Sequence, residues 1–380
     1  MKSERLRRLL QLILPMILLG VMLFCSSRVN RVFIGAGTGG SYARATVLEV
    51  EEDQSGEKPF QGTQRVLVEI TSGEYEGQQC ILNNPNSYQN GAFCVPGLKI
   101  IAFVRASSDG ILGGSVYNYD RTQMVYLLLG LFALALILVG GKKGVAALYA
   151  LVFTFICVLC MYIPLLYVGM NGILAAILTA VIILAASIYI LNGWSVKTVC
   201  AIVGTTVGIA VSGILAMAVG GAFSLSGFNM EEVESLVFIA ADTKLDVANI
   251  LYAGVLIACL GAVMDVSVSM VAAMWEVYEK VPGISPKELF ASGMRVGHDM
   301  IGTMSNTLIL AYIGSATGVV LSVYSFQMSY LQIMGHNAII IEIVSGLCGT
   351  VGVILTVPVQ ALIMTLVLKS KRWGGQQNGS

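Results

Sequence analysis

The feature that most constrains this chain is a series of long apolar segments that contain few or no charged residues. A helix of about 20 apolar residues is long enough to cross the roughly 30 Å hydrocarbon core of a bilayer. The sequence predicts about eight membrane-spanning helices, at 9–25, 123–140, 145–166, 171–191, 198–220, 247–268, 301–323 and 338–367.

Composition agrees with a polytopic membrane protein. Hydrophobic residues make up 56% of the 380 residues and charged residues only 12%, whereas soluble domains carry about 25% charged residues. The formal net charge is zero, so nothing indicates a nucleic-acid partner. The sequence contains no Walker loop, no HExxH motif and no nucleophile elbow. We therefore expect neither an enzyme nor a bound cofactor, and the lipid bilayer is the expected surrounding.

One polar region interrupts the apolar pattern. Between residues 28 and 121, apolar and polar residues alternate in ATVLEV (45–50), QRVLVEI (64–70) and LKIIAFVRA (98–106), with turn-forming stretches between them. This alternation is typical of short antiparallel strands. It predicts a small β-barrel, OB-like in type. The region lacks a basic face with interleaved aromatic residues, so we favour a structural or partner-binding module over an oligonucleotide-binding one.

The predicted domain organisation follows from these patterns. We expect an N-terminal signal anchor or transmembrane helix, the β domain, a membrane domain of seven helices and a tail, at 1–27, 28–121, 122–368 and 369–380. Cytoplasmic loops of membrane proteins are enriched in Lys and Arg, and with a cytoplasmic N-terminus the short outer loops contain only Lys244. This orientation makes both termini cytoplasmic and the β domain extracytoplasmic. An extracytoplasmic β domain would permit a disulfide between Cys80 and Cys94.

Ionisable residues within the apolar segments are the candidates for function. Each costs roughly 2.5–3.5 kcal/mol on insertion scales, so such residues usually have a role. The segment GMRVGHDMIGTMSN (293–306) places polar residues at helical spacings of three and four. We define the predicted track as Asp265, Arg295, His298, Asp299, Asn306 and Glu342.

Two interpretations of the predicted track remain open. It is either a polar path for an ion or small solute, or a structural seam that locks helix packing. Six methionines between Met264 and Met304 could supply thioether ligands for a soft metal. No ligand pattern accompanies them, so the sequence does not identify a bound metal. The motif VGTTVGI (203–209) also resembles CGTVGVI (348–354). Either inverted repeats or chance would explain this similarity.

Several stretches resemble the YibE/F-like family of bacterial integral membrane proteins. They are GAVMDVSVSMVAAMWEV (261–277), GMRVGHDMIGTMSNTLILAYIGS (293–315), EIVSGLCGTVGVILTVPVQ (342–360), and, in the polar region, QRVLVEITSGEYEGQ and LGGSVYNYDR. The resemblance implies a bacterial plasma-membrane protein with an N-terminal anchor, an extracytoplasmic β domain and a helix bundle. It also implies a related membrane subunit or a homo-oligomer as partner, and it implies no substrate.

The leading expectation is a transporter or permease for an ion or small solute. The alternative is a non-transporting envelope scaffold whose β domain binds a partner. An intramembrane enzyme ranks third.

Overall fold

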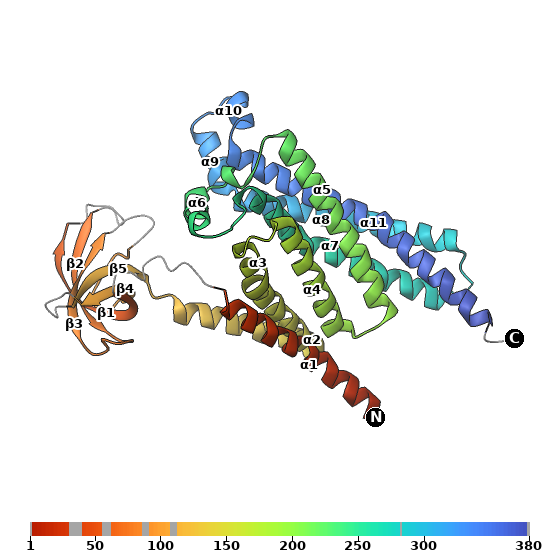
Figure 1. Ribbon diagram of the computed structural model, residues 1–380, viewed down its shortest axis with the longest axis horizontal. Coiled ribbons are helices and arrows are strands. Elements are labelled where there is room, and N and C mark those ends of the chain that lie inside the picture. The colour runs from red at the N-terminus through yellow and green to blue at the C-terminus, as the bar shows by residue number, and fades with distance from the viewer. Residues whose placement is uncertain are drawn as a thin grey trace. The chain divides into compact units, whose positions relative to one another are not determined.

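The computed structural model describes residues 2–29, 40–54, 62–85, 91–106, 112–281 and 283–377. It divides into two compact units. One unit comprises Met1–Asn30 with Val139–Ser380, and the other comprises Arg31–Leu138. Figure 1 shows the strands of the second unit and the helices of the first.

The strands close into the small barrel that the alternating pattern predicts. They are β1 (Gly40–Asp53), β2 (Thr63–Ile70), β3 (Gln79–Pro85), β4 (Lys99–Ala106) and β5 (Leu112–Tyr119). Their order around the barrel is β1-β2-β3-β5-β4. The β3–β5 pair is parallel and the other pairs are antiparallel. A core of small and branched apolar side chains fills the barrel, including Val66, Val68, Leu82, Ile100 and Val104.

Helices make up the remainder of the described chain. Their bounds are α1 (Lys2–Ser27), α2 (Thr122–Cys157), a π-helical turn (Val158–Tyr162), α3 (Ile163–Tyr167), α4 (Gly172–Asn192), α5 (Val196–Ala222), a 3₁₀ turn (Gly227–Asn229), α6 (Val233–Asp242), α7 (Val247–Lys280), α8 (Pro286–Ser315), α9 (Thr317–Ser325), α10 (Tyr330–Met334) and α11 (Asn337–Gln377).

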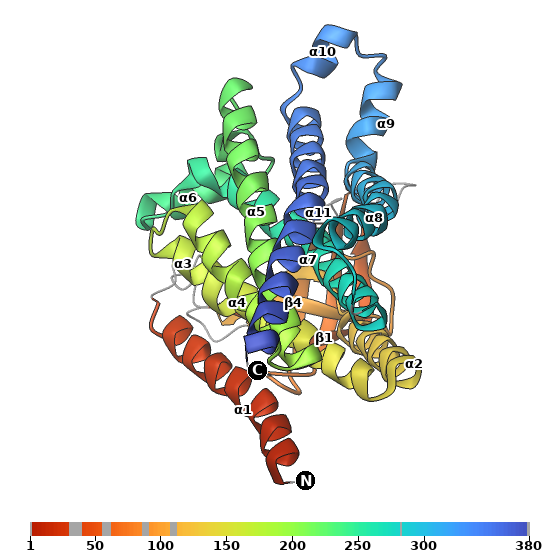
Figure 2. The same cartoon turned by 90° about the vertical axis from the view of Figure 1, so that its right-hand side faces the viewer.

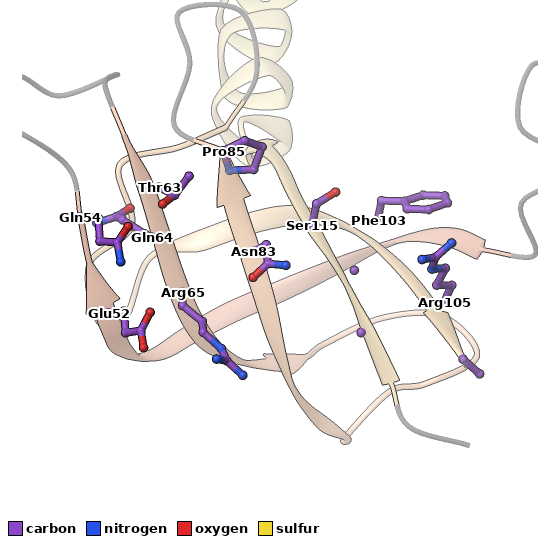
Figure 3. Close-up of a pocket in the computed structure, with 13 residues that line it drawn as sticks. Glu52, Gln54, Thr63, Gln64, Arg65, Asn83, Pro85, Phe103, Arg105 and Ser115 are labelled. Atoms are coloured by element: carbon purple, nitrogen blue, oxygen red, sulfur yellow. The ribbon is translucent and has the colours of Figure 1, made fainter. Parts of the chain in front are cut away.

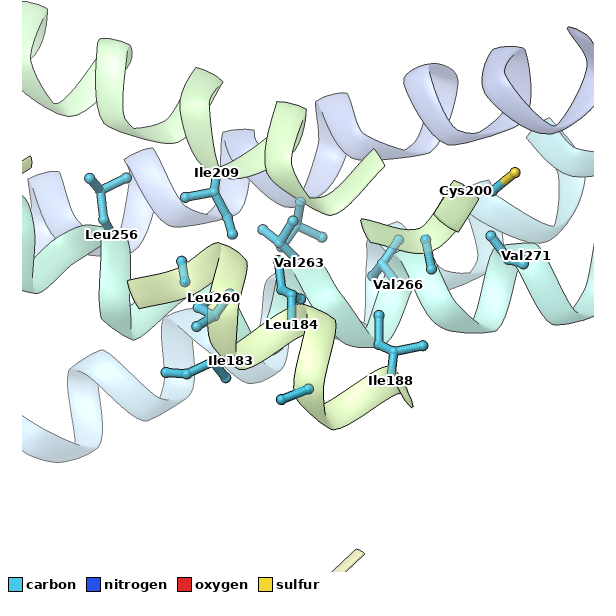
Figure 4. Packing of buried hydrophobic residues seen from close by; sticks show 14 of the residues in the cluster. Ile183, Leu184, Ile188, Cys200, Ile209, Leu256, Leu260, Val263, Val266 and Val271 are labelled. Atoms are coloured by element: carbon cyan, nitrogen blue, oxygen red, sulfur yellow. The ribbon is translucent and has the colours of Figure 1, made fainter. Parts of the chain in front are cut away.

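The helical unit is built around α7 and α11. Helix α11 contacts α5, α7 and α8, while α7 contacts α4, α5 and α8. Figure 2, which looks along the unit, shows α11 between α5 and α8. Buried apolar side chains of α4, α5 and α7 interdigitate, as Figure 4 shows for Leu184, Ile209 and Val263. Small residues allow the close approach that helices need for association in a membrane.

The two ends of the helical unit differ. The connections between α4 and α5 and between α7 and α8 lie at one end, and we call this end the basic end because Lys197, Lys280 and Lys287 lie in or beside these connections. Helices α6, α9 and α10 lie at the opposite end, which we call the α9–α10 end.

The observed helices differ in two places from the predicted spans. Within the described residues, five helical segments are long and apolar enough to cross a membrane, or six if α8 and α9 count as one bent span. The predicted spans 123–140 and 145–166 fall in one helical stretch of 46 residues, Thr122–Tyr167. Its backbone departs from helix geometry at Gly141, with φ 54° and ψ −130°. Glycine reaches this conformation without the steric cost of a side chain.

The second difference concerns the predicted span 301–323. Helices α8 and α9 meet there at a bend of 64°, around Ala316. The apolar composition continues across this bend, so hydropathy alone gave no signal for it. The first predicted span, 9–25, lies in α1, which contains the short apolar stretch Pro15–Ser27.

Candidate functional site

Helix α8 begins at a capping box formed by Ser285 and Glu288. The Ser285 hydroxyl accepts a hydrogen bond from the Glu288 backbone N–H at 3.2 Å, and the Glu288 carboxylate accepts one from the Ser285 N–H at 3.0 Å. This capping box, with Pro286 in the first turn, satisfies N–H groups that have no partner within the helix. The helix then packs through two glycines: Gly293 against Met274 of α7, and Gly297 against Val357 of α11. These contacts fix which face of α8 is buried.

The polar residues of α8 occupy the opposite face. We call Arg295, His298, Asp299, Gly302, Thr303 and Asn306 the α8 stripe, and all six are exposed. The Thr303 hydroxyl donates to the Met300 carbonyl at 3.0 Å, so this side chain is satisfied within its own helix. No described residue hydrogen-bonds the Asn306 amide, and neither Arg295 nor Asp299 has an ion-pair partner in the described part of the chain.

Asp265 also lies on an outward-facing surface. It shares an exposed face of α7 with Ser269, Ala272 and Glu276, as the helical spacing predicts. At the basic end of this face, Lys280 Nζ lies 2.7 Å from Glu276 Oε1, as an exposed pair one turn apart. Such pairs contribute little to stability. The structure therefore places Asp265 and the α8 stripe on the outer surface of the helical unit.

Glu342 differs from the other residues of the predicted track because it lines cavities. It is half-buried on α11 beside the bend between α8 and α9. A mostly apolar cavity of about 230 Å³ lies on one side, bounded by Tyr312 and Val319 among others. A more polar cavity of about 620 Å³ lies on the other, and Glu231, Glu232 and His336 line it together with Glu342. Neither cavity includes Asp265 or any residue of the α8 stripe.

The surroundings of Glu342 contain polar atoms without partners. Among the described residues, the buried Tyr312 hydroxyl and His336 Nδ1 have no hydrogen-bond partner. A buried polar group without a partner costs about 1–3 kcal/mol, so such groups mark places where a water or a ligand is expected. Sequence reasoning missed both residues, because Tyr312 is a single tyrosine inside the predicted span 301–323 and His336 lies just before the predicted span 338–367.

A second polar cluster lies in the centre of the bundle. The Gln360 side chain is fully buried, accepts a hydrogen bond from the Ser267 hydroxyl at 2.7 Å and donates one to the Cys200 carbonyl at 3.3 Å. Gly204 of α5 leaves space for this amide, since a Cβ there would overlap it. The cluster joins α5, α7 and α11. The sequence prediction placed Gln360 on α11 but gave no indication of its partner Ser267.

The motifs compared at 203–209 and 348–354 lie on helices that face each other. A Cβ on Gly208 of α5 would meet Thr356 of α11, and a Cβ on Gly352 of α11 would meet Ser212 of α5. Each helix thus offers glycine where the other offers a hydroxyl. This reciprocal packing explains the small residues in both motifs without requiring them to be repeats.

The two cysteines of the barrel are both buried free thiols. Cys80 lies on β3 opposite Val68, whereas Cys94 lies near Asn84, whose Nδ2 is 3.5 Å from Cys94 Sγ. Both thiols are free, so the disulfide that the sequence permits between them is not formed. Burial raises the pKa of the Cys94 thiol to about 11, and it raises the pKa of Cys80 as well.

The largest cavity described is a groove on the barrel, of about 1160 Å³ (Figure 3). It crosses β2, β3 and β5, which contribute Arg65, Asn83 and Ser115, and reaches Phe103 and Arg105 of β4. Arg65 forms an ion pair with Glu51, in which Arg65 Nε lies 3.6 Å from Glu51 Oε2. A groove with amide, hydroxyl and guanidinium groups can bind a polar partner.

No cluster of three or more His, Cys, Asp or Glu side chains that could hold a metal ion occurs among the described residues. In the methionine-rich region of α7 and α8, Met270 and Met274 are fully buried and contribute to packing.

Comparison with known proteins places the helical part of the chain in a family. A family model described as YibE/F-like protein matches residues 128–370, a range that extends from α2 to α11 and excludes the barrel. No curated protein and no solved structure matches the chain.

Proposed function

Because this chain belongs to the YibE/F-like protein family, whose apolar helices mark it as a membrane protein, we propose that it is a permease that moves an ion or small solute. The proposal rests chiefly on one observation. A half-buried carboxylate, Glu342, lines two cavities at a bend between two apolar helices. Interrupted helices supply free backbone groups, and transporters use such interruptions to bind ions and solutes.

The proposed topology has eight crossings in the bacterial plasma membrane, with both termini in the cytoplasm and the β domain outside. The stretch Thr122–Tyr167 is about 69 Å long at 1.5 Å per residue, roughly twice the hydrocarbon thickness. Two crossings fit if the chain turns at Gly141, where Lys142 and Lys143 follow. The basic end of the helical unit is then cytoplasmic.

The proposed barrel type is OB-like. The strand order β1-β2-β3-β5-β4, with a parallel β3–β5 pair, supports this assignment. OB barrels commonly bind ligands on the face that includes strands 2 and 3, which is the side where the groove of Figure 3 lies.

In the proposed mechanism, Glu342 receives a cation or a proton from the outer side. Glu231 and Glu232 line the same cavity, and their negative charge raises the local cation concentration. Tyr312 and His336 offer polar atoms that a passing solute or its water shell can bond. The inner half of the proposed path is the α8 stripe together with Asp265, which lies near the middle of α7.

The second candidate function is a non-transporting scaffold. The observation that favours it is the groove on the barrel, which is larger than either cavity beside Glu342. In this alternative the barrel binds an envelope partner, and Gln360 with Ser267 serves only to lock the bundle.

An ion-flux measurement separates the two functions. Purified full-length protein is reconstituted into vesicles, and flux of H⁺, Na⁺ and K⁺ under an imposed gradient is compared with that of empty vesicles. The permease proposal predicts flux above background for at least one of these ions, and its reduction to background in Glu342→Gln. The matched control is Glu234→Gln, an exposed residue of α6 that lines neither cavity, and it should retain wild-type flux. Flux no higher than in empty vesicles for all three ions would favour the scaffold.

A further inference from the structure

The α8 stripe faces away from the rest of the helical unit. The buried face of α8 is set by Gly293 and Gly297, which lie against α7 and α11. Residues of the stripe lie on the opposite side of the same helix, and all of them are exposed. The helical unit therefore leaves a charged and polar surface uncovered on a helix that the proposed topology embeds in the membrane.

Lipid is a poor partner for this surface. Arg295 lies near the basic end and could reach phosphate groups by extending its side chain. Asp299 and Asn306 lie one and three turns further from the α8 N-terminus, and their side chains are short. Polar residues of membrane helices face other protein or water rather than hydrocarbon. Asn in particular associates helices by hydrogen bonding across their interface.

We propose that the α8 stripe is the contact surface for a second copy of this chain, with the two α8 helices side by side about a two-fold axis. The inner half of the path then lies between two copies and is incomplete in one. This statement about the path rests on the proposed function, whereas the contact between copies stands without it.

Charge complementarity selects a second copy as the occupant. Arg295 and Asp299 carry opposite charges one helical turn apart and have no ion-pair partner among the described residues. In a two-fold contact, the same patch meets itself. Each guanidinium can then pair with the Asp299 carboxylate of the other copy.

The centre of the stripe suits a close helix contact. Gly302 has no neighbouring atom within 4 Å of where a Cβ would stand, so a partner backbone can approach. Asn306 follows one turn later and can bond its equivalent across the axis.

Cross-linking in the native membrane tests the contact directly. Thr303→Cys is placed in a full-length background in which the exposed Cys25 and half-buried Cys160 are replaced by serine, because the other native cysteines are buried. A short bismaleimide should convert this variant into a species of twice the monomer mass. The matched control is Ile214→Cys on α5, an exposed apolar position, which should remain monomeric. No dimer from Thr303→Cys would overturn the proposal, as would equal dimer from both variants.

A charge exchange tests complementarity between copies. In the Thr303→Cys background, Asp299→Arg leaves positive charges at both positions 295 and 299. Arg295→Asp leaves negative charges at both of these positions. Each variant alone should lose dimer about tenfold, which corresponds to ~1.4 kcal/mol. Co-expressed with different tags, the two variants should form a mixed dimer at the wild-type level.

The mixed dimer distinguishes the contact from a helix-internal ion pair. Neither variant can form a pair within its own α8, so restored cross-linking requires a contact between chains. Failure of the mixed dimer to form would overturn the proposal. A cross-linked product containing a different protein would also overturn it, in favour of a related subunit. Neither readout depends on flux, so loss of the proposed function and loss of the contact are separate results.

Discussion

Gln360 shows how much a single residue can determine in this bundle. Its amide bridges α7 and α5 at a position of full burial. A buried amide without partners would be costly, so Gln360 specifies one register of α11 against its neighbours. Hydrogen bonds of this kind orient helices that hydrophobicity alone cannot orient in a membrane.

Gly204→Ala tests this arrangement. The added Cβ would overlap the Gln360 amide and lie 3.2 Å from the Ser267 hydroxyl. Overpacking of a well-packed interior costs about 1–3 kcal/mol, so we expect a lower unfolding temperature for the purified protein. Gly221→Ala on the same helix is the control, because no atom lies within 4 Å of its Cβ position. Equal stability of the two variants would contradict the account of this cluster.

Asp120 gives the barrel a predicted pH dependence. Its carboxylate accepts a hydrogen bond from the Thr122 N–H at 3.0 Å and lies 3.4 Å from Arg44 Nε. The bonds from Thr122, followed by the charge of Arg44, hold the pKa of Asp120 below its usual value. A carboxyl with a lowered folded-state pKa stabilises the fold above its unfolded pKa of about 3.9, and this stabilisation is lost as pH falls through the folded pKa.

We therefore expect Asp120→Asn to weaken the barrel at neutral pH. Hydrogen exchange of peptides from β1 and β5, measured on the full-length protein in moderate urea, should be faster in the variant at pH 7. The difference should shrink as pH falls below about 4. A difference that persists unchanged in acid would mean that the carboxylate charge is not the cause.

At the scale of elements, the sequence predicted those features whose cause is local. The alternation in 64–70 predicts β2 because neighbouring residues determine it, and the capping box of Ser285 and Glu288 is an equally local cause for the start of α8. The bend between α8 and α9 was not predictable, since apolar residues continue through it. Its position depends on packing against α11 and on the cavities beside Glu342.

The same distinction applies to the predicted track. Helical spacing groups the residues of the α8 stripe on one face of α8, and Asp265 with Ser269 and Glu276 on one face of α7. Spacing cannot say whether such a face points toward the bundle or away from it. That direction depends on Gly293 and Gly297, which lie close to neighbouring helices through contacts that are distant in the sequence.

Gly141 is the element-scale position where a substitution should have the clearest effect. Its φ of 54° and ψ of −130° strain any residue with a side chain, at a cost on the order of 1–3 kcal/mol. No neighbouring atom lies within 4 Å of its Cβ position, so the cost of Gly141→Ala is backbone strain rather than a clash. We expect the variant to unfold at a lower temperature than wild type, whereas Gly130→Ala, also without neighbours and within α2, should not. Equal unfolding temperatures would show that the turn at Gly141 is not required.

At the scale of the whole molecule, the proposed transport requires a path with two openings. The cavities beside Glu342 are lined in part by residues of α9, at the α9–α10 end. The α8 stripe begins toward the basic end. The proposed topology assigns these ends to opposite faces of the membrane. Basic residues at one end and acidic cavity residues at the other agree with this assignment.

Side-specific labelling is the measurement that tests this central claim most directly. Val319→Cys lines both cavities beside Glu342, and Arg295→Cys begins the α8 stripe. Each is made in the background without Cys25 and Cys160 and is exposed to a membrane-impermeant thiol reagent in intact cells and in inverted vesicles. The account predicts that Val319→Cys reacts in intact cells and that Arg295→Cys reacts only in inverted vesicles. Labelling of both positions from the same side would contradict a path across the membrane.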